Sequence, residues 1–172
     1  MTIDKSVDGR GRDTVTMSPD GPGETPSMPP RPQLPDLAAA RELGPAATVE
    51  ARWQQLLLVW RWHHTRHEIL KPGTAYPGIV SLIEAAGAEP RLRQLYPFTS
   101  HYNLNFSSFT SYPWSIQVPS VDPLHDGWFR VRRRRSAEVL GFARTADTAV
   151  SLVVGNLPAG LGPAVAHQQT GR

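Results

Sequence analysis

The sequence has 172 residues and no cysteine. The absence of cysteine excludes disulfide bonds, thiolate zinc sites and cysteine nucleophiles, and we expect a protein of the reducing cytoplasm. Long apolar runs are also missing. The longest candidate, residues 149–154, is much shorter than the ~20 apolar residues of a membrane-spanning helix. Residues 1–10 have no apolar run after their charges, so we expect neither a secretory signal nor a membrane partner.

The first 45 residues contain no aromatic side chain, yet they hold eight of the 17 prolines. A segment this poor in large apolar groups cannot bury enough surface to offset ~1–2 kcal/mol of backbone entropy per residue. We therefore predict a disordered N-terminal arm over residues 1–45, with a short helical turn at Leu37–Leu43. A single domain is predicted over residues 46–165, followed by a flexible tail over residues 166–172.

Charge is distributed unevenly along the chain. The net charge is +3; residues 1–45 hold five basic and seven acidic residues, and residues 46–172 hold thirteen and eight. A mildly basic domain favours an anionic ligand, and an acidic arm can shield the same cationic face. Ordinary surface charge explains the surplus equally well, so charge alone does not identify a partner.

Apolar and histidine side chains recur at steps of three and four in the first part of the domain. They are Val49, Trp53, Leu56, Trp60, His63 and His67. This spacing predicts an amphipathic helix that begins at an N-cap on Thr48 and ends near Leu70. A second helix is predicted from Pro77 to Ala86, and Pro90 opens a third, short helical turn.

The pattern changes to alternation after Pro97. Alternating apolar and polar residues occupy positions 103–107, 114–118, 128–135 and 137–143. These segments predict short antiparallel strands, and Thr145 is a suitable N-cap for a last helix over residues 146–154. Helices followed by strands favour an α+β fold, with N-terminal helices packed on a short antiparallel β-meander and a closing C-terminal helix.

Four potential metal ligands lie in one predicted helix: His63, His64, His67 and Glu68. His63 and His67 are four residues apart, as are His64 and Glu68, and either pair has chelating spacing. A catalytic metal needs a third ligand, for which His101, His125 and Asp126 are candidates. However, the segment is not HExxH, and histidines near a helix end also favour the helix dipole. We therefore expect no metal and no cofactor.

An arginine run follows Trp128 and Phe129 and extends from Arg130 to Arg135. In a strand, Arg130, Arg132 and Arg134 share one face and form a candidate anion-binding site. The alternative is a solvated hairpin end whose charges discourage edge pairing. Nucleic acid is not the expected partner, because no nucleic-acid-binding motif accompanies the run. Pairing of these arginines with Asp122, Asp126 and Glu138 would remove the basis of that hypothesis.

The segment PRLRQLYPFTSHYNLNFS, residues 90–107, contains arginines, aromatics, hydroxyls and a histidine but no carboxylate. Arg93, Tyr96, Ser100 and His101 are its candidate ligand-binding residues, for an anionic or aromatic ligand. Ser100 and His101 are adjacent, and adjacent residues of an extended chain point to opposite sides, so a catalytic dyad is not expected. The structural alternative is that the aromatic rings pack the junction between helices and sheet.

Four short motifs carry a family resemblance: residues 90–107, GWFRVR at 127–132, VLGFARTADTA at 139–149 and LPAGLGPAV at 157–165. Together they resemble an actinobacterial family of unknown function (family 6193), over roughly residues 85–165. Members of that family are often labelled natural-product biosynthesis proteins. The resemblance implies a setting in natural-product biosynthesis and names no reaction.

We therefore expect an uncharacterised cytoplasmic accessory protein that binds a small molecule or a partner protein. One alternative is an enzyme with a pocket around Arg93, Tyr96 and His101. The other is a module that binds nucleic acid or an acidic partner through residues 130–135.

Overall fold

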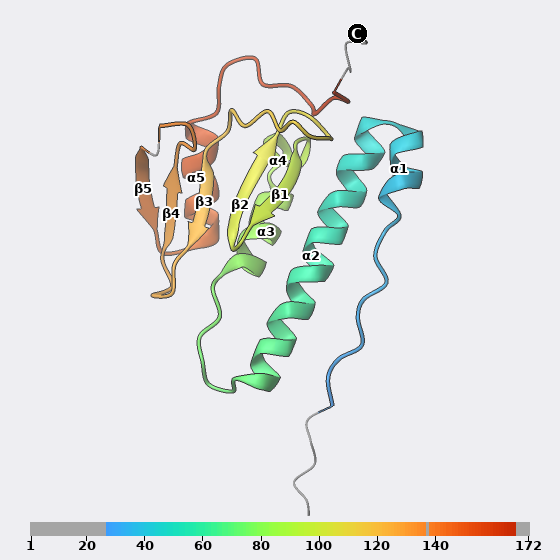
Figure 1. Ribbon diagram of the computed structural model, residues 1–172. Helices are drawn as coiled ribbons and strands as arrows, with labels where there is room; N and C mark the ends of the chain where they lie inside the picture. The colour runs from blue at the N-terminus through green and yellow to red at the C-terminus, as the bar shows by residue number, and fades with distance from the viewer. Residues whose placement is uncertain (1–26, 137, 168–172) are drawn as a thin grey trace, which may run out of the picture.

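The computed structural model describes residues 27–136 and 138–167. Helices come first, an antiparallel sheet follows, and a helix closes the fold (Figure 1). In chain order the elements are α1 (Leu37–Leu43), α2 (Pro45–Leu70), α3 (Ile79–Ala88), α4 (Pro90–Arg93), β1 (Tyr96–Ser100), β2 (Asn103–Ser107), β3 (Ser120–Pro123), β4 (Phe129–Arg132), β5 (Val139–Ala143) and α5 (Ala146–Gly155). The predicted α+β class is confirmed.

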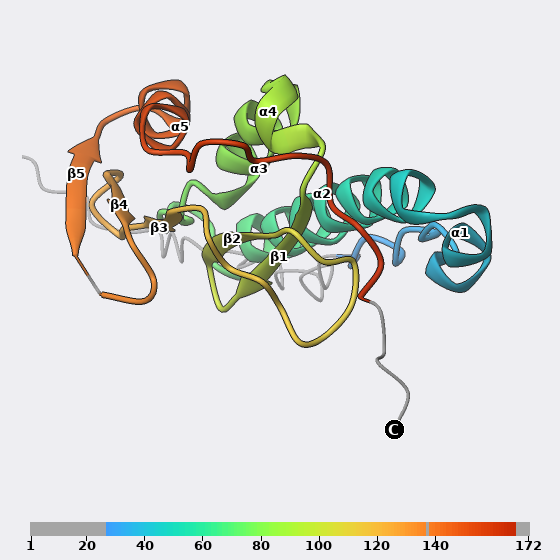
Figure 2. The ribbon, with the colours of Figure 1, turned by 90° about the horizontal axis from the view of Figure 1, so that it is seen from above.

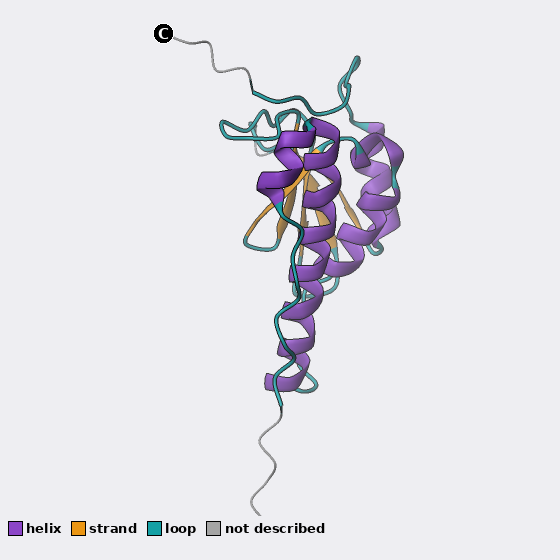
Figure 3. Ribbon diagram, turned by 90° about the vertical axis from the view of Figure 1, so that its right-hand side faces the viewer, coloured by secondary structure: helices purple, strands orange, loops and turns teal. Residues whose placement is uncertain are grey.

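The strands form a single antiparallel sheet in the order β1-β2-β3-β4-β5. Helices α3 and α5 cover one face of the sheet, and α2 packs beside β1 (Figure 2). The loop between β2 and β3 crosses the opposite face (Figure 2). The long helix α2 extends well past the ends of the strands (Figure 3). Its last turns therefore pack against the α2–α3 loop and the β1–β2 turn.

The core lies between the sheet and the helices. Leu104 and Phe106 of β2 are 0% and 1% exposed, as the predicted alternation requires. Trp53 of α2 is 1% exposed and packs on Phe106. Its indole Nε1 donates hydrogen bonds to the carbonyl oxygens of Arg93 and Leu95, at 3.0 and 3.1 Å. Because its one polar atom is satisfied, the buried indole contributes its full hydrophobic stabilisation, about 1.5–3 kcal/mol.

Helix α2 begins at Pro45, three residues before the predicted cap, so the prediction of Thr48 as N-cap is wrong. Proline suits the first helical position because it has no N–H to satisfy. Gly44 has a φ of 110°, which a residue with a side chain rarely adopts, and this turn separates α1 from α2. The Thr48 hydroxyl donates to the Gly44 carbonyl at 2.9 Å and does not cap the helix.

Two strands were not predicted from the alternation, and one predicted strand is absent. β1 and β3 are regular strands, whereas residues 114–118 belong to no strand. The alternation in that segment has another cause: Trp114 stacks on Tyr96 and Phe98 of β1, with ring centroids 5.3 and 5.1 Å apart. β4 ends at Arg132, earlier than predicted, because the Arg133 N–H donates to the Glu138 carbonyl at 2.8 Å and turns the chain toward β5.

Part of the predicted arm packs against α2. Helix α1 coincides with the predicted helical turn, and Asp36 caps it by accepting hydrogen bonds from two backbone N–H groups. Trp62 of α2 donates to the Pro29 carbonyl at 3.1 Å, and the Arg31 guanidinium lies over the Trp62 ring. Residues 1–26 and 168–172 of the predicted arm and tail lie outside the described residues. The division into arm, domain and tail remains a prediction.

None of the described helices combines the length and the apolar composition that crossing a lipid bilayer requires.

Candidate functional site

Two of the four candidate ligand-binding residues have structural partners near the start of β1. Arg93, in α4, forms an ion pair with Glu50 of α2, with Nη2 2.6 Å from Oε1, and its guanidinium lies over Trp53. The hydrogen bond from Arg93 lowers the pKa of Glu50 below its ordinary value, against the opposing effect of burial. Tyr96 is 4% exposed and stacks on Trp114. Both residues therefore tie α2, α4 and the β2–β3 loop together.

The other two candidates lie at the far end of β1. Ser100 is the last residue of β1, and His101 follows it in the turn to β2. Tyr96 pairs with Ser107, whereas Ser100 pairs with Asn103 at the opposite end of the same ladder. The structure therefore separates Arg93 and Tyr96 from Ser100 and His101, and the pocket around Arg93, Tyr96 and His101 is not assembled.

His101 has a φ of 56°, the only positive φ among the described residues other than glycine. Ser100 and Asn103 are paired, so His101 and Tyr102 form a two-residue hairpin turn with a positive φ at its first position. That position favours glycine, because a Cβ in the left-handed region costs roughly 1–2 kcal/mol. The fold thus retains an imidazole where the backbone alone favours a residue without a side chain.

The His101 side chain contributes to a pocket of about 390 Å³ that we call the ring pocket. Its walls are Trp60, His63, Arg66, His67 and Leu70 of α2, Tyr76 of the α2–α3 loop, and His101 and Tyr102 of the β1–β2 turn. The pocket joins three segments far apart in the sequence. It forms where the C-terminal half of α2 extends beyond the sheet.

Contacts between the rings hold these walls in place. Tyr102 packs on Trp60 with ring centroids 5.3 Å apart, and its edge meets Tyr76 at 5.8 Å. Tyr76 also packs on His67 at 4.9 Å. The Trp60 indole N–H donates to the Thr99 hydroxyl at 3.3 Å, which leaves the indole face as its available surface. Such offset and edge-on pairs are each worth about 0.5–1.5 kcal/mol beyond burial, so they fix the rings relative to one another.

The protonation states in the ring pocket are set by burial and by neighbouring charges. Burial lowers the pKa of His63 below its ordinary value, and the positive charges of Arg66 and Arg31 lower it further. Burial, followed by the influence of Tyr102, raises the pKa of Tyr76 to about 12. At neutral pH the pocket therefore presents a neutral His63 imidazole and a Tyr76 hydroxyl able to donate a hydrogen bond. No carboxylate is among the pocket walls that the structure describes.

The histidines of α2 do not form a metal site with other residues of the described ranges, 27–136 and 138–167. His64 stacks on Tyr76 and lies 3.6 Å from the Glu68 carboxylate. His67 Nε2 lies 3.1 Å from the Thr74 carbonyl oxygen, which can only accept, so Nε2 carries the proton. These partners are sufficient to explain both side chains without a metal ion.

Of the candidate anion-binding arginines, Arg130 and Arg132 lie in β4, and Arg134 lies in the turn that follows it. Arg130 and Arg132 both donate to the carboxylate of Asp122, which is 2% exposed. Arg134 Nη1 donates to the side-chain oxygen of Asn105 at 2.8 Å. Arg133, which is not one of the candidate residues, pairs with Glu138. Three of the five arginines in residues 130–135 are thus engaged with carboxylates, and the continuous basic face that nucleic-acid binding needs is not formed.

Sequence reasoning did not identify Trp60, Tyr76 and Tyr102 as walls of a pocket. Tyr76 precedes a proline, which indicates the boundary of a helix or strand. The spacing of Trp60 predicts a residue on the buried face of a helix. The positive φ of His101 has no sequence signal at all. The sequence did contain one signal for this pocket. Aromatic and histidine residues cluster in the C-terminal part of α2, beyond the helical turns that pack against the sheet.

Comparison with protein-family models shows which family the chain belongs to. A family model described as a family of unknown function, DUF6193, matches residues 47–168. The chain belongs to this family. The match covers α2 from residue 47 onward, which the motif resemblance did not reach. Comparisons with curated proteins and with solved structures give no match.

Proposed function

We propose that this protein is an accessory protein that binds a small planar molecule in the ring pocket, and that it acts in natural-product biosynthesis in an actinobacterial cytoplasm. The motif resemblance supports the biosynthetic setting. The absence of cysteine supports a reducing compartment. The ring pocket supports the binding role.

One observation carries the binding role: the left-handed turn residue next to Tyr102 is a histidine and not a glycine. The strained position brings an imidazole to a pocket whose other walls are aromatic. Residues kept in unfavourable backbone conformations cluster at binding sites, where the strain is part of the function. A role in ligand binding explains why the imidazole is retained there.

The pocket walls define the ligand class. Rings bind planar ligands by stacking and edge-on contacts, and a pocket of about 390 Å³ is within the usual range for small molecules. Arg66, the imidazoles and the Tyr76 hydroxyl all provide hydrogen-bond donors. With donors and rings but no carboxylate among its described walls, the pocket favours an aromatic acid.

Catalysis is not part of the proposal. His101 makes no hydrogen bond to any other residue of the described chain, and no carboxylate orients its ring. General-base activation needs a histidine within hydrogen-bond reach of a nucleophile and held by a third group. Neither condition is met by His101.

The experiment is a titration with 2-naphthoate, monitored by tryptophan fluorescence and by chemical shifts of the imidazoles. The saturated analogue decahydro-2-naphthoate has the same charge without the aromatic ring. We expect 2-naphthoate to bind and the analogue to bind at least about tenfold more weakly, because the stacking contribution is lost.

Two variants complete the test. His101→Gly should weaken 2-naphthoate binding while leaving the fold intact, and Tyr112→Leu should have no effect, because Tyr112 is 79% exposed and outside the pocket. Equal affinity for the two ligands, or equal affinity of the two variants, would show that the ring pocket is not the binding site.

A further inference from the structure

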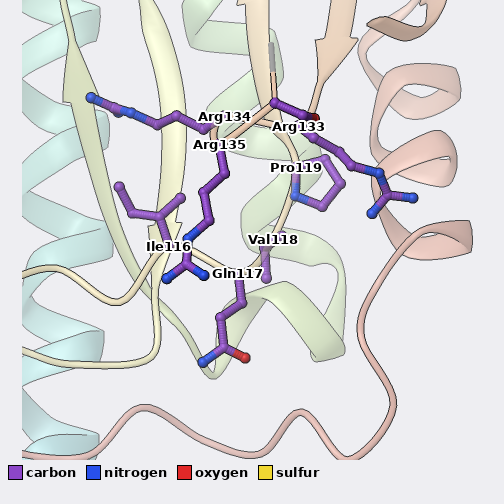
Figure 4. A pocket seen from close by; sticks show the side chains of 8 residues that line it. Ile116, Gln117, Val118, Pro119, Arg133, Arg134 and Arg135 are labelled. Carbon is purple, nitrogen blue, oxygen red and sulfur yellow. The ribbon is translucent and has the colours of Figure 1, made fainter. Parts of the chain in front are cut away.

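A second cavity forms where the β3–β4 ladder opens. Paired residues of this ladder end at Ser120 and Arg132. Pro119 has no N–H to extend the ladder, and the Arg133 N–H is already used by the Glu138 carbonyl. The two chain segments therefore diverge and enclose a cavity of about 340 Å³ between residues 116–119 and residues 133–136 (Figure 4).

The cavity has an excess of positive charge. Arg133, Arg134 and Arg135 all contribute to its walls, and no carboxylate does so among the described residues. Arg133 is compensated by Glu138, with Nε 3.1 Å from Oε2. Arg134 and Arg135 form no ion pair with any residue in the described part of the chain. Two guanidinium charges thus remain uncompensated at one site.

Arg134 is held in place by a neutral group. Its Nη1 donates to the Asn105 side-chain oxygen at 2.8 Å, and Asn105 is 1% exposed. The Asn105 amide is itself oriented, because Nδ2 donates to the Asn103 carbonyl at 3.0 Å. The Arg134 guanidinium also lies over the Phe98 ring. A buried neutral acceptor fixes the position of the charge without neutralising it, which is the condition for a preorganised anion site.

Arg135 is the arginine that reaches across the cavity. Figure 4 shows its guanidinium extending toward Ile116 and Gln117, while Arg133 and Arg134 point away to either side. Ile116, which is half-buried, and the Pro119 ring provide an apolar wall beside it. The cavity therefore combines one accessible guanidinium, a fixed positive charge nearby and an apolar surface.

We propose that this cavity binds a small organic oxyanion, with the anionic group on Arg135 and an apolar group against Ile116 and Pro119. Arg134 adds electrostatic attraction from its fixed position. A phosphate monoester and a carboxylate share this chemistry. The site is separate from the ring pocket, and neither proposal depends on the other.

The test compares binding of hexyl phosphate, hexanoate and inorganic phosphate to the full-length protein by calorimetry and by chemical-shift changes at residues 116–119 and 133–136. Both hexyl compounds should bind more tightly than inorganic phosphate, because they alone contact the apolar wall. The ratio between hexyl phosphate and hexanoate identifies which oxyanion the site prefers.

Arg135→Gln should weaken hexyl phosphate binding roughly tenfold to a hundredfold, the range for loss of a charge-assisted hydrogen bond. Arg91→Gln is the matched control, because Arg91 is an exposed arginine of α4 outside the cavity. Equal loss in the two variants would reduce the effect to general electrostatic attraction and overturn the proposal. Inorganic phosphate binding as tightly as hexyl phosphate would also overturn it.

Discussion

Asp122 and Arg130 lie directly opposite each other in the β3–β4 ladder, and the carboxylate accepts two hydrogen bonds from the guanidinium, at 3.1 and 2.9 Å. The same carboxylate also accepts from Arg132, which belongs to the pair two positions further along the ladder. Because Asp122 is only 2% exposed, its charge depends on these two arginines. This cluster links β3 to β4 and holds the side chains of Arg130 and Arg132 on the outer face of the sheet.

Replacing the carboxylate should therefore cost more than replacing a surface acid. We expect Asp122→Asn to lower the free energy of unfolding by about 2–3 kcal/mol, since charge-assisted hydrogen bonds are lost from a buried position. Glu84→Gln is the control, because Glu84 pairs with Arg61 through side chains that are 45% and 55% exposed. That change should cost less than about 1 kcal/mol. Urea unfolding of both variants measures the difference, and similar losses would contradict the interpretation.

The turn residue His101 gives a second prediction. Glycine adopts a φ of 56° without steric strain, whereas alanine keeps the strain and lacks the imidazole. We expect His101→Gly to be more stable than His101→Ala by about 1 kcal/mol. Thermal unfolding of the two variants measures this difference. A more stable alanine variant would mean that the turn conformation is not strained.

The phenol of Tyr76 should titrate later than an exposed phenol. Its pKa is raised to about 12, so the folded state keeps this proton where the unfolded state has lost it. The neutral phenol therefore contributes to stability up to a pH of ~10, and this contribution is lost as the pH rises from there through about 12. Tyrosinate absorbance should show one late step that is missing from Tyr76→Phe. Removal of an early step instead would contradict the assignment.

Two tryptophans of α2 should differ in their importance for stability. Trp53→Phe loses both indole hydrogen bonds and leaves a cavity in the core, which should cost about 3 kcal/mol. Trp62→Phe loses one hydrogen bond to the Pro29 carbonyl near the N-terminal side of the described chain and should cost about 1 kcal/mol. Denaturant unfolding curves test the order, and a larger loss for Trp62→Phe would contradict it.

Most helices were predictable because their signals are local. The short helix over Leu37–Leu43, the extent of α2 to Leu70 and the Thr145 cap of α5 all follow from residues within one or two turns. The Thr145 side chain accepts from the Thr148 N–H at 3.2 Å, as the cap prediction requires. Errors occurred where partners decide the outcome. Residues 114–118 alternate like a strand but have no strand to pair with, because Trp114 packs on the face of β1.

The candidate sites show the same limit. Arg93, Tyr96, Ser100 and His101 are close in the sequence, but a strand of five residues lies between the ends of this group and separates them by about 17 Å. Trp60 and Tyr102 are 42 positions apart and yet pack together, because α2 lies beside the β1–β2 hairpin. Proximity in the sequence therefore did not predict membership of the ring pocket.

The sequence by itself determined the α+β class, the helix periodicity and the absence of thiol chemistry, because each depends on composition or on spacing within one element. Only the tertiary structure decided which arginines are compensated and which rings form a pocket. Asp122 pairs with both Arg130 and Arg132 because of the β3–β4 pairing, whereas Arg134 donates to the neutral Asn105 side chain. Charge compensation depends on distances between elements, which pairing and packing alone set.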